Sequence, residues 1–358
     1  SLPPFLPFLP FPMYKIQTLN NISLRGLERL PRDRYEVASE LVRPDALLVR
    51  SADVHAIEIP ASVLAVARAG AGTNNIPVAK LSQRGIPVFN APGANANAVK
   101  ELVLAGLFLA ARNICQAWDY VRKLEGDDHA LEAAMEQGKK KFVGYELPGR
   151  TLGVVGLGAI GVEVANAALH LGMKVMGYDP QITVQRAWQL SSGVEQALSL
   201  DDLFARSDVV TVHVPLNDHT RGLVNASRIA LMRKGSAVLN FARGQIVDEA
   251  AVLAGLDNGQ LSAYVCDFPT NAVRAHARVV ALPHLGASTG EAEENCAIMA
   301  AETLREFLEN GNVRHSVNFP EAVLPRAGVS RLAIANANVP NMVGQISTCL
   351  AEARLNIA

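Results

Sequence analysis

The chain has 358 residues, the length of about two domains, and 49% of them are hydrophobic, which is enough for sizeable cores. The formal net charge of −1 argues against a partner such as nucleic acid or an anionic membrane surface. Four widely spaced cysteines without a CxxC pair favour free thiols in a reducing, cytoplasmic setting over disulfides or a metal site.

Two apolar segments could suggest a membrane protein, but neither has the required features. The first twelve residues, SLPPFLPFLPFP, are rich in proline and lack the positive charge with which a signal sequence begins. We therefore leave them out of the predicted fold, which starts at Met13. The longest apolar run, 102–111, is too short to cross a bilayer.

Residues 14–92 alternate short apolar runs with helical or turn-like pieces. The predicted strands are 14–19, 35–39, 46–50, 65–70 and 87–92. This alternation indicates a parallel α/β sheet. A long helix with an apolar face follows over 95–113.

A second series of apolar runs begins after Arg150. The predicted strands are 151–157, 174–179, 209–214, 236–242, 263–268 and 279–284. Each is almost continuously apolar, as expected for strands covered on both faces. Helical segments such as 248–259 separate them, so this part predicts a doubly wound, Rossmann-like fold.

The chain closes with a helix over 289–311 and a shorter pattern of strand, turn and helix near its end. One strand and one helix cannot form a stable core by themselves. The predicted fold class is therefore α/β, with two Rossmann-like or flavodoxin-like parallel-sheet domains and a partial C-terminal segment.

A dinucleotide fingerprint, GVVGLGAIG, places Gly156, Gly158 and Gly161 in a GxGxxG pattern between a strand and a helix. The glycines permit a tight turn, a close backbone approach to a pyrophosphate and close packing of helix on strand. The next strand ends at Asp179, at the spacing expected for an acid that accepts from the ribose hydroxyls. That charge favours NAD over NADP, although Asp179 at a strand end also suits a turn former.

Four motifs in order, GRTLGVVGLGAIG, HVPL, NFARGQIVDE and PHLGAST, resemble the D-isomer-specific 2-hydroxyacid dehydrogenases. Within that family the chain is most similar to the phosphoglycerate dehydrogenases, because RLAIANANVPNMVGQIS resembles the start of their regulatory ACT domain. The resemblance implies a substrate domain from 13–97 and 286–320, an NAD domain at 98–285 and a truncated ACT-like segment at 328–358.

The resemblance implies two catalytic residues, each placed after a predicted strand. Arg243 in NFARG would bind the substrate carboxylate and keto oxygen, for which a guanidinium fork is suited. His284 in PHLGAS would be the acid and base, because its ordinary pKa lies near neutrality. A surface arginine and a structural histidine are the plainer interpretations.

The remaining predicted contacts divide between cofactor and substrate, and no metal is expected. The predicted NAD contacts are Gly156, Gly158, Ala159, Ile160, Gly161, Asp179, His213, Val214, Pro215, Phe241, Ala242, Arg243, Asp267, His284 and Gly286. The predicted substrate contacts are Arg50, Ser51, Arg68, Gly70, Gly72 and Arg243. Arg68 could be either a phosphate-binding residue or a solvent-exposed surface charge. The lysines of 138–142 are better explained as solvent-exposed surface charges.

One family feature is missing from the sequence. The family pairs its histidine with a glutamate five residues after the aspartate that matches Asp267, and that position holds Ala272 here. No acid lies between 268 and 290, so a neighbour such as Asn271 is the remaining local candidate. A neutral partner stabilises the imidazolium less than a carboxylate does, so we expect a reduced rate or a shifted pH optimum.

The resemblance thus implies NAD-dependent oxidation of D-3-phosphoglycerate to 3-phosphohydroxypyruvate, a reversible step of serine biosynthesis. The expected partner is a small phosphorylated 2-hydroxy acid, and the expected assembly is a homodimer or homotetramer. Two alternatives stay open: a glyoxylate or hydroxypyruvate reductase of the same family, and a weakly active NAD-binding sensor.

Overall fold

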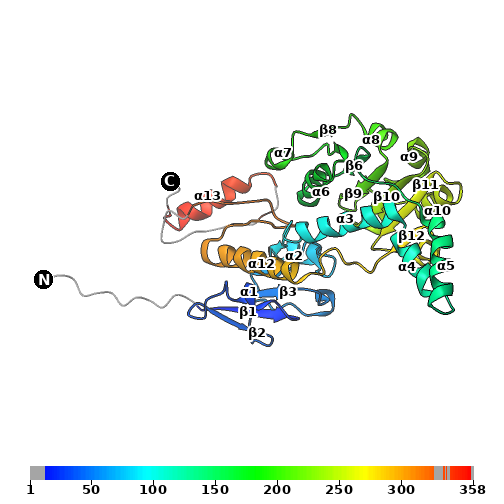
Figure 1. Cartoon of the computed structure of the whole chain (residues 1–358). Coiled ribbons are helices and arrows are strands. Elements are labelled where there is room, and N and C mark those ends of the chain that lie inside the picture. The colour runs from blue at the N-terminus through cyan, green and yellow to red at the C-terminus, as the bar shows by residue number, and fades with distance from the viewer. Residues whose placement is uncertain (1–12, 326–333, 335, 337–338, 356–358) are drawn as a thin grey trace. The chain divides into compact units, whose positions relative to one another are not determined.

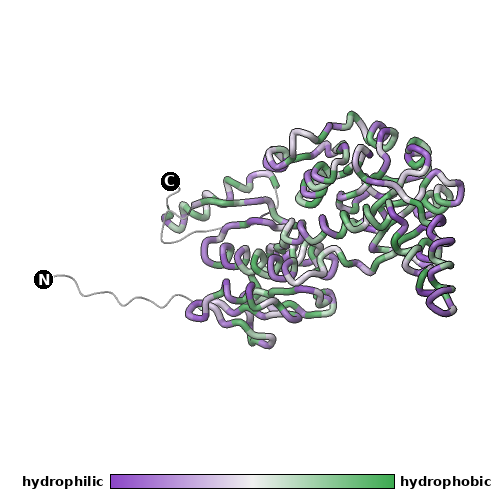
Figure 2. The backbone as a smooth tube through the Cα atoms, viewed as in Figure 1, coloured by the Kyte–Doolittle hydropathy of each residue, from purple (hydrophilic) through white to green (hydrophobic). Residues whose placement is uncertain are grey.

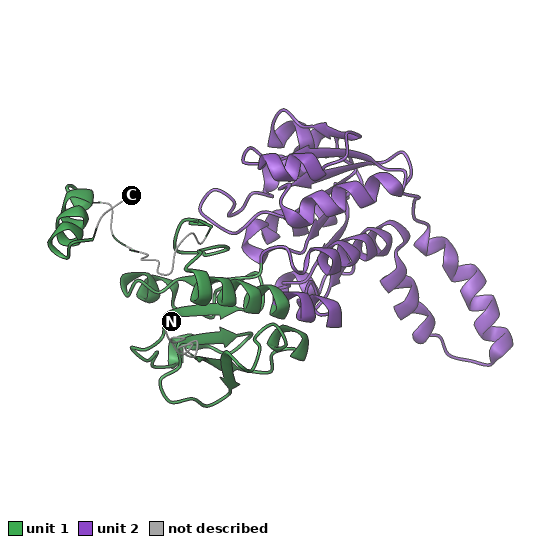
Figure 3. Ribbon diagram, turned by 90° about the vertical axis from the view of Figure 1, so that its left-hand side faces the viewer, with its two compact units in different colours: residues 1–91, 297–358 green, residues 92–296 purple. Residues whose placement is uncertain are grey.

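The computed structural model describes residues 13–325, 334, 336 and 339–355. It divides into two compact units, unit 1 with residues 1–91 and 297–358 and unit 2 with residues 92–296 (Figure 3). Each unit is built on its own parallel sheet, as the sequence predicts. The finer domain boundaries drawn from the sequence stay a prediction, and the proline-rich residues 1–12 lie outside the described part.

Unit 1 contains a five-stranded sheet in the order β2-β1-β3-β4-β5, with all neighbouring strands parallel. This is the order of flavodoxin-like folds. The strands are β1 (Tyr14–Leu19), β2 (Tyr35–Ala38), β3 (Ala46–Val49), β4 (Ala65–Arg68) and β5 (Val88–Phe89). The short helical elements of this part are α1 (Leu24–Leu27), η1 (Val54–Ala56) and α2 (Val78–Gln83), and the later half of α12 (Gly290–Asn310) belongs to it as well.

Unit 2 contains a seven-stranded parallel sheet in the order β12-β11-β10-β9-β6-β7-β8. Its strands are β6 (Thr151–Val155), β7 (Lys174–Tyr178), β8 (Val194–Gln196), β9 (Val209–Val212), β10 (Ser236–Asn240), β11 (Leu261–Cys266) and β12 (Val279–Ala281). The strand order reverses between β6 and β9, as in a Rossmann fold. The six predicted strands are confirmed, and the short edge strand β8 was missed because only one of its residues is apolar.

Helices cover both faces of the seven-stranded sheet (Figure 1). Val154 and Leu239 point into one core, with α3 (Ala96–Arg112) and α6 (Ala159–His170), whereas Val155 and Val238 point into the other. Alternate strand residues therefore serve opposite cores, which is why these strands read as continuous apolar runs. The second core includes α8 (Leu200–Arg206), α9 (Ala226–Leu231) and α10 (Glu249–Asp257). Hydrophobic and hydrophilic positions alternate along the helices (Figure 2).

Two further helices, α4 (Ile114–Arg122) and α5 (Asp128–Gly138), extend from unit 2 as a hairpin (Figure 1). The short helix η2 (Lys139–Phe142) leads from them back to β6. The sequence predicted α3 and α12 but not this hairpin. Helix α13 (Met342–Glu352) matches the helical half of the expected ACT-like segment, and most of the expected strand lies outside the described residues. Among the described helices, none is long and apolar enough to cross a membrane.

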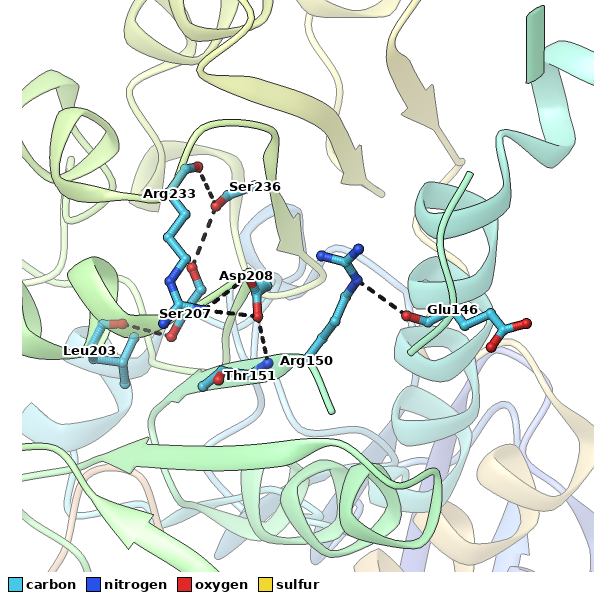
Figure 4. Close-up of polar contacts among 8 residues, drawn as sticks. All are labelled: Glu146, Arg150, Thr151, Leu203, Ser207, Asp208, Arg233 and Ser236. Atoms are coloured by element: carbon cyan, nitrogen blue, oxygen red, sulfur yellow. Dashed lines mark hydrogen bonds and ion pairs between the residues drawn. The ribbon is translucent and has the colours of Figure 1, made fainter. Parts of the chain in front are cut away.

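A polar network ties together the amino ends of β6, β9 and β10 (Figure 4). Asp208 accepts a hydrogen bond from the Thr151 amide at 2.8 Å and from Nη1 of Arg233 at 3.2 Å. Ser236 Oγ donates to the Ser207 carbonyl at 3.4 Å. The network lies at the edge opposite the strand ends at which parallel sheets bind ligands, so its role is to hold the sheet together.

We expect Asp208→Ala to lower the free energy of unfolding by about 1–3 kcal/mol, because the Thr151 amide and the Arg233 guanidinium both lose their acceptor. Urea denaturation followed by circular dichroism measures the change. The matched control is Asp257→Ala, which removes a carboxylate that is 74% exposed and contacts only His276 among the described ion pairs. The control should change stability by no more than about 0.5 kcal/mol. Equal effects of the two substitutions would contradict the assigned role.

Candidate functional site

The turn between β6 and α6 is built for close backbone approach. Gly156 has a φ of +90°, and a Cβ there would lie 2.8 Å from the His213 carbonyl oxygen. A Cβ on Gly161 would lie 1.9 Å from the carbonyl oxygen of Gly156, so only glycine allows the helix to sit this close to the strand. A Cβ on Gly158 would meet no atom within 4 Å, which leaves space beside the first turn of α6.

Asp179 ties this turn to the end of β7. One carboxylate oxygen accepts from the Leu157 amide at 2.8 Å, and the other accepts from the Gln181 amide at 2.9 Å. Each oxygen keeps a second lone pair, so the carboxylate can still accept from a ribose hydroxyl. The acid and the glycine turn therefore form one unit, as the fingerprint predicts.

The segments after β9 and β10 lie at the same edge of the sheet because the strands are parallel. His213 follows β9, and its Nε2 lies 3.0 Å from Thr211 Oγ1. Desolvation lowers the pKa of His213 to about 4, so its ring is neutral at pH 7. His213 is thus unsuited to supply a proton near neutrality.

Asn240, the last residue of β10, shapes the turn that presents Arg243. Its side chain is fully buried, and its Oδ1 accepts from the Ala242 amide at 3.1 Å. Its Nδ2 donates to the Arg243 carbonyl at 2.9 Å. Sequence reasoning missed this residue, although a polar residue that ends an otherwise apolar strand is a usable signal.

Arg243 and His284 both lie close to the Phe268 ring. The Cζ of Arg243 is 5.5 Å from the ring centroid, and the His284 ring centroid is 4.3 Å from it. The His284 amide donates to the Asp267 carbonyl at 3.0 Å, and the His284 side chain is exposed. The structure thus brings together the predicted carboxylate-binding cation and the predicted acid and base, through an aromatic residue that the sequence analysis did not single out.

Asp267 is a buried carboxylate beside this group. Its side chain is only 2% exposed, and within the described chain neither carboxylate oxygen has a hydrogen bond of ordinary geometry. Burial raises its pKa to about 6, and the Gly286 amide and the Arg243 charge oppose that rise only in part. A buried acceptor whose oxygens lack a hydrogen bond of ordinary geometry fits a ligand that brings a donor, and the carboxamide of a nicotinamide ring does so.

The segment expected to hold a glutamate forms the short helix α11 (Asn271–Arg274). Ala272 is exposed, and the side-chain oxygen of Asn271 accepts from Nε of Arg274 at 2.8 Å. A carboxylate reaches this segment from elsewhere, because Glu249 at the start of α10 accepts from the Thr270 hydroxyl. Glu249 was not predicted from the sequence, because the glutamate was expected only among the residues that follow Asp267.

In unit 1 the predicted substrate contacts gather at the carboxyl ends of β3 and β4. Arg68 Nε donates to the Arg50 carbonyl at 3.0 Å, and its Nη1 donates to the Gly72 carbonyl. The Gly70 amide donates to the Arg68 carbonyl at 2.8 Å, and the Ser51 amide donates to Asn20 Oδ1 at 3.0 Å. Arg68 therefore braces the loops of this end of the sheet, a role that neither interpretation of the sequence anticipated. The lysines of η2 are exposed.

Comparison with known proteins shows the family to which the chain belongs. The model of the D-isomer specific 2-hydroxyacid dehydrogenase, NAD binding domain, matches residues 104–286. A D-3-phosphoglycerate dehydrogenase of Haemophilus influenzae is 34% identical over 314 residues, which are 84% of this chain and 73% of that relative. The chain belongs to the D-isomer specific 2-hydroxyacid dehydrogenase family. Unit 2 contains the family's NAD-binding domain, and the glycine turn, Asp179 and the buried Asp267 fit that cofactor.

Other members of this family agree. A D-3-phosphoglycerate dehydrogenase of Archaeoglobus fulgidus is 37% identical over 317 residues, 85% of this chain and 58% of that relative. The crystal structure of cofactor (NAD+) bound 3-phosphoglycerate dehydrogenase in Entamoeba histolytica matches with a TM-score of 0.65 and 26% identity, over 86% of this chain and 99% of that one. The chain spans only 55–59% of the length of the first curated relatives that it matches.

We expect Asp267→Asn to stabilise the protein without nucleotide at pH 8 but hardly at pH 4. The folded-state pKa of about 6 lies above the ordinary value of 3.8 for an aspartate, so the group contributes stability below pH 3.8 and loses it as the pH rises through 6. The gain from the substitution should therefore grow by on the order of 2 kcal/mol between the two pH values. Urea denaturation at both pH values measures it, with Asp257→Asn as the exposed control. A gain independent of pH would contradict the assignment.

Proposed function

We propose that the protein interconverts a 2-hydroxy acid and its 2-keto acid with NAD(H). The observation that carries this proposal is that Arg243 and His284 both lie close to the ring of Phe268, beside the buried Asp267. One group suits a carboxylate and the other suits a proton transfer. Both stand at the carboxyl end of the sheet that carries the dinucleotide turn, the edge at which such folds bind ligands.

In this mechanism the residues bind the substrate and handle the proton. Arg243 holds the substrate carboxylate and polarises the keto oxygen, which becomes negative as the carbonyl carbon is reduced. His284 in its protonated form gives its proton to that oxygen, and in the oxidation direction it takes the hydroxyl proton. NAD(H), when bound, supplies the hydride donor or acceptor. Keto acid, NADH and one proton thus balance hydroxy acid and NAD+.

The cofactor contacts predicted from the sequence are part of this proposal. The residues of the glycine turn, from Gly156 to Gly161, hold the pyrophosphate, and Asp179 accepts from the adenosine ribose. A 2′-phosphate would bring negative charge toward the Asp179 carboxylate, so NAD is preferred over NADP. Val214, Pro215, Phe241, Ala242 and Gly286 line the path from the turn to the nicotinamide. Asp267 accepts from the carboxamide, which provides the donor that its buried oxygens lack.

For the substrate we propose D-3-phosphoglycerate, oxidised reversibly to 3-phosphohydroxypyruvate in serine biosynthesis. The support is that several curated relatives at 32–38% identity bear the name D-3-phosphoglycerate dehydrogenase. Arg50, Ser51 and the glycine loop of Gly70 and Gly72 form the substrate side in this proposal. The four free cysteines support a cytoplasmic reaction. A glyoxylate or hydroxypyruvate reductase is the competing assignment within the family.

We expect Arg243→Ala to lower kcat/KM for keto-acid reduction by at least about 100-fold, because the substrate carboxylate loses a charged partner. His284→Ala should lower kcat by about 100- to 10,000-fold, the usual contribution of a general acid. Steady-state rates with NADH and three keto acids, namely phosphohydroxypyruvate, hydroxypyruvate and glyoxylate, measure both effects and rank the substrates.

Binding of NADH, followed by its fluorescence, is the control for both variants and should persist in His284→Ala. His219→Ala removes an exposed histidine outside the predicted contacts and should leave the rates unchanged. Full activity of His284→Ala would discard the mechanism. A preference for glyoxylate over phosphohydroxypyruvate would favour the reductase, and NADH binding without turnover of any keto acid would favour a sensor.

We also propose that the chain forms a homodimer or homotetramer. Phe108, Ile114, Trp118 and Val121 line a groove on α3 and α4 and expose much of their apolar surface. Contiguous apolar patches of this kind mark association surfaces. Light scattering at micromolar concentration should give at least a dimer mass, and Trp118→Glu should reduce it, whereas Trp188→Glu at another exposed tryptophan should not. A monomer mass for the unchanged protein would contradict the proposal.

A further inference from the structure

Helix α7 (Val184–Gln189) places an arginine, Arg186, near Gly93, which packs against the first residue of α6. A Cβ built on Gly93 would lie 3.7 Å from Nη2 of Arg186 and 2.8 Å from Cβ of Ala159. Ala159 is the first residue of α6, the helix that follows the turn. The guanidinium of Arg186 therefore lies next to the first turn of α6, although it belongs to a different helix that begins after Asp179.

The close approach of Gly93 to Ala159 marks this as a packed position. Gly93 has a φ of +78°, and any larger residue would collide with the Ala159 side chain. The segment before α3 thus lies against the start of α6, and Arg186 reaches the same point from the side of β7. These three residues all belong to unit 2, so their arrangement does not depend on the other unit.

Several contacts fix α7 so that Arg186 keeps this direction. Thr183 caps the helix by accepting from the Arg186 amide at 3.3 Å. Asn166 on α6 holds the far end, because it donates to the Gln189 carbonyl at 2.9 Å and accepts from the Ser191 amide at 2.8 Å. The Arg186 side chain is itself braced, since its Nη1 donates to Gln189 Oε1 at 2.7 Å. Nη2 is the nitrogen that lies beside Gly93.

The chemistry of the turn gives this arginine a role. The first three residues of α6, Ala159, Ile160 and Gly161, carry no charge, so α6 offers an anion only its backbone amides and its dipole. A pyrophosphate bound there has two negative charges. We infer that Arg186 is a cofactor-binding residue that contacts the pyrophosphate of the dinucleotide across the glycine turn. This inference rests on the proposed binding of NAD(H).

Two other roles for Arg186 predict different behaviour. An arginine that stacked on the adenine ring would strengthen the binding of adenosine as much as that of a whole dinucleotide. An arginine that only packed α7 against α6 would affect stability and would bind no ligand group. A comparison of ligands with and without the pyrophosphate separates all three roles.

The experiment measures the dissociation constants of NADH, ADP-ribose and adenosine for the full chain and for Arg186→Gln. NADH is followed by its fluorescence, and the other two by competition. Loss of a charge-assisted contact should weaken NADH and ADP-ribose by about 10- to 100-fold, while adenosine should change by less than about 2-fold. Arg186→Lys should recover part of the loss, because it restores the charge but not the fork. Raising the salt concentration should weaken the wild type more than Arg186→Gln.

Gln185→Ala, an exposed neighbour on the same helix, is the matched control and should bind all three ligands as the wild type does. Unchanged ADP-ribose binding in Arg186→Gln would overturn the inference, and so would an equal loss for adenosine. If Arg186→Gln does not fold, Arg186→Lys is the test of the inference. If the folded Arg186→Lys variant binds ADP-ribose no more strongly than adenosine, the inference is also overturned. Failure of the wild type to bind NADH would instead refute the proposed function.

Discussion

The contact between Gly161 and Gly156 is the constraint on which the site depends. The start of α6 lies so close to the turn after β6 that a Cβ on Gly161 would be 1.9 Å from the Gly156 carbonyl oxygen, which leaves no room for a methyl group. That contact directs the amides of the first helical turn toward the edge of the sheet. The Leu157 amide between the two glycines is in turn held by Asp179. The glycine turn, Asp179 and Arg186 are therefore arranged around one backbone contact.

The geometry of the parallel sheet brings the other residues of the site together. Each strand of unit 2 ends at the same edge, so residues far apart in sequence arrive together when they follow β10, β11 and β12. Arg243, Phe268 and His284 meet in this way. The opposite edge is closed by Asp208, which binds the start of one neighbouring strand and the loop before another. One edge is thus fixed by internal pairs, and the other keeps charged and titratable groups for a ligand.

The sequence predicted the features that depend on local pattern. Six of seven strands in unit 2, all five in unit 1 and the helices α3, α10 and α12 follow from apolar runs and their spacing. The glycine turn with Asp179 follows from a fingerprint whose geometry is set by the backbone. Strand β8 was not predicted because an edge strand with a single apolar residue has no apolar run. The hairpin of α4 and α5 escaped because most of its residues stay exposed, so burial leaves little periodicity to detect.

Contacts between side chains that are far apart along the chain could not be predicted from the sequence. Nothing local predicts that the Phe268 ring lies close to both Arg243 and His284, or that the Arg186 guanidinium lies beside Gly93 at the start of another helix. Glu249 is the clearest case. The acid expected near Asp267 along the chain is absent, yet a carboxylate reaches Thr270 from the start of α10. Position along the sequence is a poor guide here, because a parallel sheet places successive strand ends side by side.

The buried Asp267 connects the stability of the protein with its ligand. A carboxylate that is 2% exposed and has no hydrogen bond of ordinary geometry from the described residues makes the unliganded protein less stable at neutral pH, as its raised pKa of about 6 indicates. A residue chosen for stability alone would be apolar or hydrogen-bonded at this position. A ligand that brings an N–H to the carboxylate removes that cost on binding, so part of its affinity comes from relief of a penalty already present in the fold. The acceptor is in place before the ligand arrives.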